Sequence, residues 1–160
     1  MTAPSIPKQG PVVAIDGPAG TGKSSATRRL ADVLGFVHVD TGALYRAIAL
    51  LALEDAPSET LDAWFGSEGF RRLAGELAHK IKLEFKRDGR KNPANRILAN
   101  GKDVTPLIRT PEVSMAASRV SAVPEVREAL HELQRRLGTV GKAILEGRDI
   151  GTVIFPDFTV

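Results

Sequence analysis

The segment from Gly17 to Ser24 reads GPAGTGKS and constrains the fold of this chain more than any other stretch. It has the spacing of a phosphate-binding P-loop, in which glycines at fixed positions precede a lysine and a serine or threonine. A short run rich in β-branched residues, Pro11 to Asp16, comes before it, and a helix-like stretch, Ser24 to Leu34, follows. A strand, a glycine-rich loop and a helix in this order predict a nucleotide-binding α/β domain.

The residue types of this loop suit a nucleoside triphosphate. Glycines allow backbone N–H groups to converge on phosphate oxygens, and the N-terminus of the following helix adds partial positive charge. We expect Lys23 to reach the β- and γ-phosphates and Ser24 to hold Mg²⁺ through its hydroxyl. The predicted binding segment is Gly17, Pro18, Ala19, Gly20, Thr21, Gly22, Lys23, Ser24 and Ser25. The loop alone does not identify the phosphoryl acceptor.

Two more short strands are predicted around this loop. Phe36 to Asp40 (FVHVD) alternates as a strand before Thr41 opens a helix, and Lys142 to Leu145 (KAIL) is typical of a buried strand. Strands that alternate with helices predict a parallel sheet flanked by helices, with ligands bound beyond the carboxyl ends of the strands.

The middle of the chain predicts a small antiparallel insert. A helical stretch, interrupted around Gly66 and Gly69, precedes it, and a pair of helices that begin at prolines follows it. The expected elements are a helix over Ser58 to Ala78, a strand over Ile81 to Phe85, a turn over Lys86 to Asn95, a hairpin over Arg96 to Thr105 that turns at Asn100 and Gly101, and helices over Pro111 to Ala122 and Pro124 to Leu137.

Polar residues follow the second and third predicted strands. After the second, Thr41 and Arg46 suit a second phosphate, or else are an N-cap and a solvated helix residue. After the third, Arg148 is suited to neutralise a phosphate, and Asp149 is suited to accept hydrogen bonds from a base, a sugar or a magnesium-bound water. The alternative is that both residues belong to a surface salt bridge. The three histidines show no ligand spacing, so we expect no metal site built from protein side chains alone.

Composition narrows the class of protein. The 160 residues, with 42% hydrophobic and 26% charged residues, fit one principal globular domain. The apolar run from Ala47 to Leu53 is too short to span a bilayer, and the first ten residues do not resemble a secretory signal. The absence of cysteine fits a reducing compartment, so the cytoplasm is expected. A net charge of +3 without a basic block gives no support to nucleic-acid binding.

From about Pro11 to its last residue, the sequence resembles the bacterial cytidylate kinases. The segments that carry the resemblance are AIDGPAGTGKSS, VDTGALYR, NGKDVTPLIRTPEV, AASRVSAVPEVREAL and EGRDIGTVIFPD. The resemblance implies a P-loop nucleoside monophosphate kinase-like parallel sheet flanked by helices, with a small antiparallel β insert in the monophosphate-binding domain. The corresponding division is a tail over 1–10, a first core part over 11–56, the monophosphate-binding insert over 57–110, and a continuation of the core over 111–160.

The resemblance also implies a reaction, the Mg²⁺-assisted transfer of the γ-phosphoryl group of ATP to CMP or dCMP. Lys23, Arg46 and Arg148 would then act in catalysis. Thr41, Arg46 and Arg148 would hold the acceptor phosphate, while Ser118, Arg127 and Asp149 would read the edge of cytosine. From their chemistry alone, Ser118 and Arg127 carry no functional signal. A monomer that binds ATP and CMP or dCMP, and neither nucleic acid nor membrane, is expected.

Family members continue past VIFPD into a further strand and a lid with arginines, so we expect this chain alone to be poorly active. Two other functions stay open at this point. One is a different small P-loop kinase, for example one that acts on shikimate, although DTGALYR and EGRDIGT argue against it. The other is a nucleotide-binding fragment without turnover.

Overall fold

The computed structural model describes residues 11–18, 20–57, 60–86, 96–139 and 141–157 of the chain. The predicted tail over 1–10, Ala19, and all but the first residue of the predicted turn over Lys86 to Asn95 lie outside this part.

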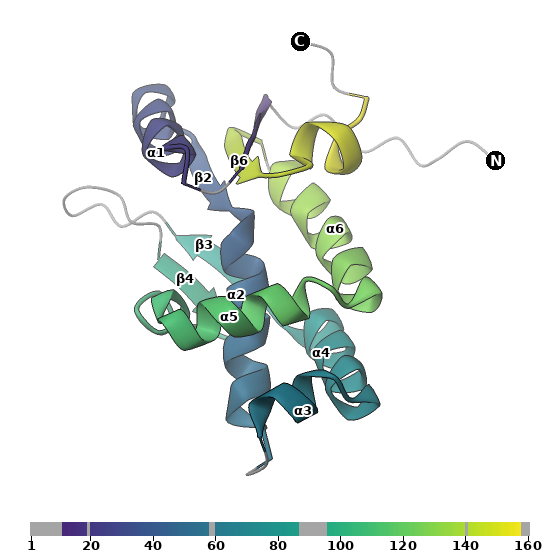
Figure 1. The fold of residues 1–160 in the computed structure, drawn as a ribbon. Coiled ribbons are helices and arrows are strands. Elements are labelled where there is room, and N and C mark those ends of the chain that lie inside the picture. The colour runs from purple at the N-terminus through teal and green to yellow at the C-terminus, as the bar shows by residue number, and fades with distance from the viewer. Residues whose placement is uncertain (1–10, 19, 58–59, 87–95, 140, 158–160) are drawn as a thin grey trace.

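A three-stranded parallel sheet forms one end of the molecule, with the order β1-β6-β2 (Figure 1). Its strands are β1 (Val12–Asp16), β2 (Val37–Asp40) and β6 (Ala143–Gly147). β6 lies in the centre, where Asp16 of β1 is in register with Gly147 and Asp40 of β2 with Glu146. The carboxyl ends of all three strands therefore meet at one rim, as the sequence predicts.

Helices make up most of the remaining described chain. They are α1 (Lys23–Leu34), α2 (Thr41–Glu54), α3 (Leu61–Phe65), α4 (Glu68–Lys80), α5 (Pro111–Val120) and α6 (Pro124–Thr139), with a 3-10 turn at Leu107–Arg109 and a π-helical turn at Ile150–Ile154. Several begin or end where the sequence predicts. The Thr110 side chain accepts a hydrogen bond from the N–H of Val113 at the start of α5, and Gly35 ends α1 with φ of 66°.

The antiparallel insert is present as a small sheet, with β3 (Leu83–Lys86), β4 (Arg96–Ala99) and β5 (Lys102–Asp103) in sequential order. Asn100 and Gly101 connect β4 to β5 with φ of 51° and 82°. Positive φ at both central residues is the requirement of the tight hairpin turn that Asn-Gly favours. The predicted hairpin is therefore confirmed.

Buried side chains form two clusters. The larger one surrounds α2, which runs from the parallel sheet between the other helices and is crossed by α5, and it includes Leu44, Ile48, Phe70, Ile108 and Leu130 (Figure 1). The smaller one joins the sheet to the π-helical turn through Val39, Leu145, Ile150, Ile154 and Phe155. This arrangement of a helix-flanked parallel sheet with a separate antiparallel sheet is the predicted fold class. The exact domain boundaries stay a prediction.

Three details differ from the sequence-based expectation. Gly69 does not interrupt a helix, because α4 begins at Glu68, where the side chain of Ser67 caps the N–H of Phe70. The strand expected from Ile81 is β3, which begins only at Leu83. The π-helical turn after Asp149 was not predicted at all. No helix within the described residues is long and apolar enough to cross a membrane.

The contact between α6 and Phe155 yields a stability prediction. A Cβ atom at Gly138 would lie 2.5 Å from Cζ of Phe155 and 3.4 Å from Cδ1 of Leu145. We expect Gly138→Ala to lower the free energy of unfolding by about 1–2 kcal/mol, since overpacking outweighs the gain in helix propensity.

Urea-induced unfolding measures this effect, with Gly69→Ala as the matched control. A Cβ atom at Gly69 would make only an ordinary contact, 3.6 Å from Oγ of Ser67. Equal stability of the two variants would contradict the packing described for Phe155.

Candidate active site

The described part of the P-loop has a backbone that only glycine adopts without strain. Gly20 and Gly22 have φ of 80° and 78°. No atom lies within 4 Å of a Cβ built at either position, so the requirement for glycine comes from the backbone angle and not from crowding. α1 begins directly after Gly22, and its first N–H groups face the loop.

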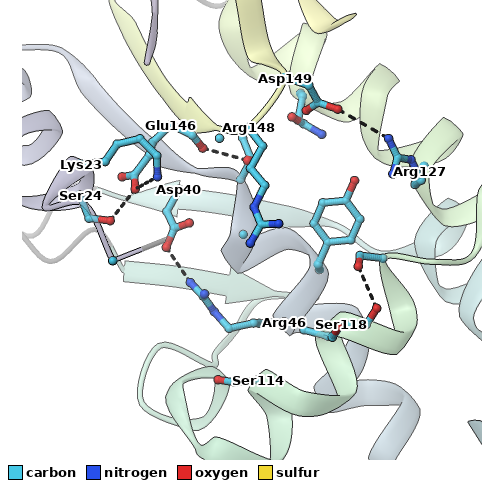
Figure 2. A pocket seen from close by; sticks show the side chains of 18 of the residues that line it. Lys23, Ser24, Asp40, Arg46, Ser114, Ser118, Arg127, Glu146, Arg148 and Asp149 are labelled. Carbon is cyan, nitrogen blue, oxygen red and sulfur yellow. Dashed lines mark hydrogen bonds and ion pairs between the residues drawn. The ribbon is translucent and has the colours of Figure 1, made fainter. Parts of the chain in front are cut away.

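Glu146, at the end of the central strand, joins the P-loop to the neighbouring strand. Its side chain is 5% exposed. One carboxylate oxygen, Oε1, accepts from Nζ of Lys23 at 3.2 Å and from Oγ of Ser24. The other, Oε2, lies 2.9 Å from Nε2 of His38. The backbone carbonyl of Glu146 accepts a bond of 2.8 Å from the Thr41 hydroxyl at the start of α2. Figure 2 shows the Lys23 and Ser24 contacts.

These contacts determine the charge state of Glu146. Burial by itself raises the pKa of a carboxyl group, but the hydrogen bonds from Ser24, His38 and Lys23 outweigh it, and the pKa of Glu146 is lowered from 4.5. Glu146 is therefore ionised at neutral pH, in spite of its burial.

Glu146 and His38 are site residues that the sequence reasoning missed. His38 belongs to the predicted strand Phe36 to Asp40, from which no role for it follows, whereas in the structure it is buried and faces the Glu146 carboxylate. The available signal was a carboxylate directly after the apolar strand KAIL, at the same rim as the P-loop. The partner of that carboxylate was not visible, because His38 lies 108 positions away.

Arg46 lies on α2, across the rim from the P-loop. Its Nη2 atom donates to Oδ2 of Asp40 at 2.6 Å (Figure 2). Arg46 Nε is the one buried side-chain nitrogen or oxygen without a hydrogen-bond partner among the described residues. A buried N–H without a partner costs free energy unless a ligand or water accepts from it. Arg46 thus lines the cavity with a guanidinium whose hydrogen-bonding capacity is only partly used within the described residues.

A second group of predicted residues lies beside α5 and α6. Nη2 of Arg127 is 3.6 Å from Oδ2 of Asp149, and Ser118 lies nearby on α5 (Figure 2). Tyr45 on α2 lines the same cavity as this group. Burial raises the pKa of Tyr45, the Arg127 charge opposes this, and the Asp149 charge adds to it. The phenol is thus neutral at physiological pH.

These groups border a single cavity of about 610 Å³. The cavity brings together most of the predicted site residues from four segments of the chain. They are Gly20, Gly22, Lys23, Ser24, Ser25, Thr41, Arg46, Ser118, Arg127, Arg148 and Asp149. Gly17, Pro18 and Thr21 belong to the loop but are not among the residues that line the cavity. Asp40, Tyr45, Gln134 and Glu146 line it without having been predicted.

The oxygens of Ser24 and Glu146 are suitable donors for Mg²⁺, which prefers hydroxyl, carboxylate, phosphate and water oxygens. The described residues contain no group of three or more His, Cys, Asp or Glu side chains arranged to hold a metal ion by themselves. This donor set fits an ion that is bound together with nucleotide phosphates.

Comparisons with known proteins agree with this arrangement. The family model "Cytidylate kinase" matches residues 13–160. A cytidylate kinase of Geobacter sp. (strain M21) is 49% identical over 97% of this chain, and one of Citrifermentans bemidjiense is 46% identical over 98%. A bifunctional pantoate ligase/cytidylate kinase of Acaryochloris marina is 45% identical over 92%. The chain spans 61%, 62% and 26% of the lengths of these relatives, respectively.

The contacts of Glu146 predict a pH-dependent effect on stability. Because the folded-state pKa is lowered, the stabilisation is present above the ordinary carboxyl pKa and is lost as pH falls through the folded-state value. At about pH 7, we expect Glu146→Gln to lower the free energy of unfolding by about 3 kcal/mol, as for one partner of a buried ion pair. The difference from wild type should shrink as pH falls below the ordinary carboxyl pKa of 4.5 and through the folded-state value.

Urea unfolding over this pH range measures the difference, with the exposed Glu128→Gln as the control. If Glu146→Gln lowers the free energy of unfolding by the same amount at every pH, the charge of Glu146 is not the cause of the effect.

Proposed function

Because the chain belongs to the cytidylate kinase family, we propose that the protein transfers the γ-phosphoryl group of ATP to CMP or dCMP, giving ADP and CDP or dCDP in pyrimidine nucleotide metabolism. The observation that carries this proposal is the shared cavity. It places a P-loop lysine and serine opposite Arg46 and Arg148, as a donor triphosphate and an acceptor phosphate would need (Figure 2).

On the donor side, the P-loop backbone would surround the phosphates of ATP. The Lys23 ammonium donates to the Glu146 carboxylate at 3.2 Å. A triphosphate carries more negative charge than one carboxylate, so Lys23 would turn toward the β- and γ-phosphates when ATP binds. Glu146 would thus hold the Lys23 ammonium in place until the nucleotide binds.

Mg²⁺, when bound with ATP, would supply neutralisation of the phosphate charge. Ser24 would hold it through the hydroxyl, which at present donates to Glu146. The Glu146 carboxylate, ionised at neutral pH, adds negative charge beside that hydroxyl and would accept hydrogen bonds from waters around the ion.

On the acceptor side, no general base is needed, because a nucleoside monophosphate already presents an ionised oxygen at neutral pH. The work of the site would be positioning and charge neutralisation. Arg46, Thr41 and Arg148, which line the same cavity, would contact the acceptor phosphate. Lys23, Arg46 and Arg148 would stabilise the charge that moves between the two nucleotides.

Ser118, Arg127 and Asp149 would read the base. Cytosine presents acceptors at O2 and N3 and a donor at N4, which a hydroxyl, a guanidinium and a carboxylate complement. Uracil lacks the N4 donor, so it would leave a carboxylate unpaired. The 3.6 Å contact of Arg127 with Asp149 holds these two charges at the same side of the cavity. The monomeric state and the cytoplasmic location stay predictions from the sequence.

A panel of acceptors tests this proposal. ADP release from ATP and Mg²⁺ is measured with CMP, dCMP, UMP, AMP and shikimate, and binding of each acceptor is measured in parallel by its effect on thermal unfolding. We expect CMP and dCMP to be preferred over UMP by at least about a hundredfold, since a site built to hydrogen-bond a group rejects ligands that lack it.

Lys23→Ala is the control that assigns turnover to this P-loop, and it should abolish ADP release. ADP release with UMP equal to that with CMP would refute the assignment of Ser118, Arg127 and Asp149 to recognition of cytosine. A response to shikimate alone, or to no acceptor in either measurement, would refute the proposed function.

A further inference from the structure

Asp16, the last residue of β1, makes a contact that the proposed mechanism does not use. Its carboxylate accepts two backbone hydrogen bonds, from the N–H of Ile150 to Oδ1 and from the N–H of Gly151 to Oδ2, each of 2.8 Å. These are the first N–H groups of the π-helical turn, which have no acceptor within the turn itself. Asp16 therefore caps a turn that lies more than a hundred residues away in sequence.

The residues between this cap and the sheet are the ones proposed to contact the acceptor nucleotide. Gly147 pairs in register with Asp16, and its carbonyl accepts a bond of 3.2 Å from the N–H of Gly17. Arg148 and Asp149 alone separate this anchor from the cap at Ile150. Both ends of this short loop are thus attached to the segment Asp16–Gly17.

The same segment leads directly into the P-loop, so the donor and acceptor sides share one support. The packing of the turn reinforces the attachment. Ile150 is fully buried, and a Cβ atom at Gly147 would lie 2.6 Å from its Cδ1. The carbonyl of Asp149 accepts from the N–H of Val153 at 2.8 Å, which fixes the backbone of the residue proposed to read cytosine.

We propose that Asp16 is a positioning residue that sets the placement of Arg148 and Asp149, and thereby the affinity and base selectivity of the acceptor site. This inference rests on the proposed function. Both carboxylate oxygens accept backbone N–H groups, which supports a positioning role. Charge-assisted hydrogen bonds to adjacent N–H groups are directional, so a change in the position of the Asp16 carboxylate would move the loop that contains Arg148 and Asp149.

The test compares Asp16→Asn with wild type in three measurements: CMP affinity, UMP affinity and ATP affinity, each by calorimetric titration. Asn has nearly the same shape, but only one of its terminal atoms can accept a hydrogen bond. We expect a loss of about tenfold in CMP affinity, a smaller preference for CMP over UMP, and ATP affinity within about twofold of wild type. Asp62→Asn is the matched control, because the Asp62 side chain is 92% exposed.

Hydrogen exchange of the Ile150 and Gly151 amides reports on the Asp16 cap itself, independently of nucleotide affinity. We expect faster exchange of both amides in Asp16→Asn. Faster exchange with unchanged CMP affinity would overturn the proposal, since the cap would then be structural only. Equal losses of CMP and ATP affinity would also overturn it. If Asp16→Asn does not fold, Asp16→Glu carries the same test, because it keeps the charge and displaces the carboxylate by one methylene.

Failure of the proposed function is recognised separately, in the wild-type chain. A wild type that binds ATP but neither CMP nor dCMP would refute that function and this inference with it. A wild type that binds CMP, together with an Asp16→Asn variant of equal affinity and selectivity, would refute the inference alone.

Discussion

The buried carboxylate of Glu146 is the constraint on which the rest of the site depends. A carboxylate 5% exposed is costly unless charged or polar partners surround it. Those partners come from the P-loop helix and from the neighbouring strand. The backbone carbonyl of the same residue accepts from Thr41 at the start of α2, so Glu146 joins three elements at the rim of the sheet. The position of β6 in the centre of the sheet makes this possible, because its end is next to both neighbours.

The parallel sheet explains why distant segments form one cavity. Each strand ends at the same rim. The P-loop follows β1, α2 begins directly after Asp40 at the end of β2, and Arg148 and Asp149 follow β6. Helices α5 and α6 close the far side of the cavity and bring Ser118 and Arg127 to it. The strand ends thus place the P-loop, Arg148 and Asp149, whereas helices place Arg46, Ser118 and Arg127. Precise placement at such a rim is what phosphoryl transfer requires of a protein.

Local patterns in the sequence predicted the parts of this fold that local physics controls. The P-loop backbone, the Asn100–Gly101 hairpin turn and the helix start at Pro111 each depend on a few neighbouring residues and were predicted correctly. The Glu146–His38 pair joins residues 108 positions apart, and the Asp16 cap joins residues 134 and 135 positions apart. Periodicity and propensity describe neighbouring residues, so they do not predict these contacts. Ser118 and Arg127 entered only through the family resemblance, because a serine and an arginine on exposed helix faces are ordinary.

The central claim of this account is that one cavity binds the donor and the acceptor nucleotides side by side. A ligand in which adenosine and cytidine are joined 5′ to 5′ through a chain of phosphates tests it most directly, in calorimetric competition with ATP and with CMP. The account predicts that one molecule of this ligand binds per chain and displaces both nucleotides. A ligand that displaces ATP and leaves CMP binding unchanged would contradict it, since the two nucleotides would then occupy separate places.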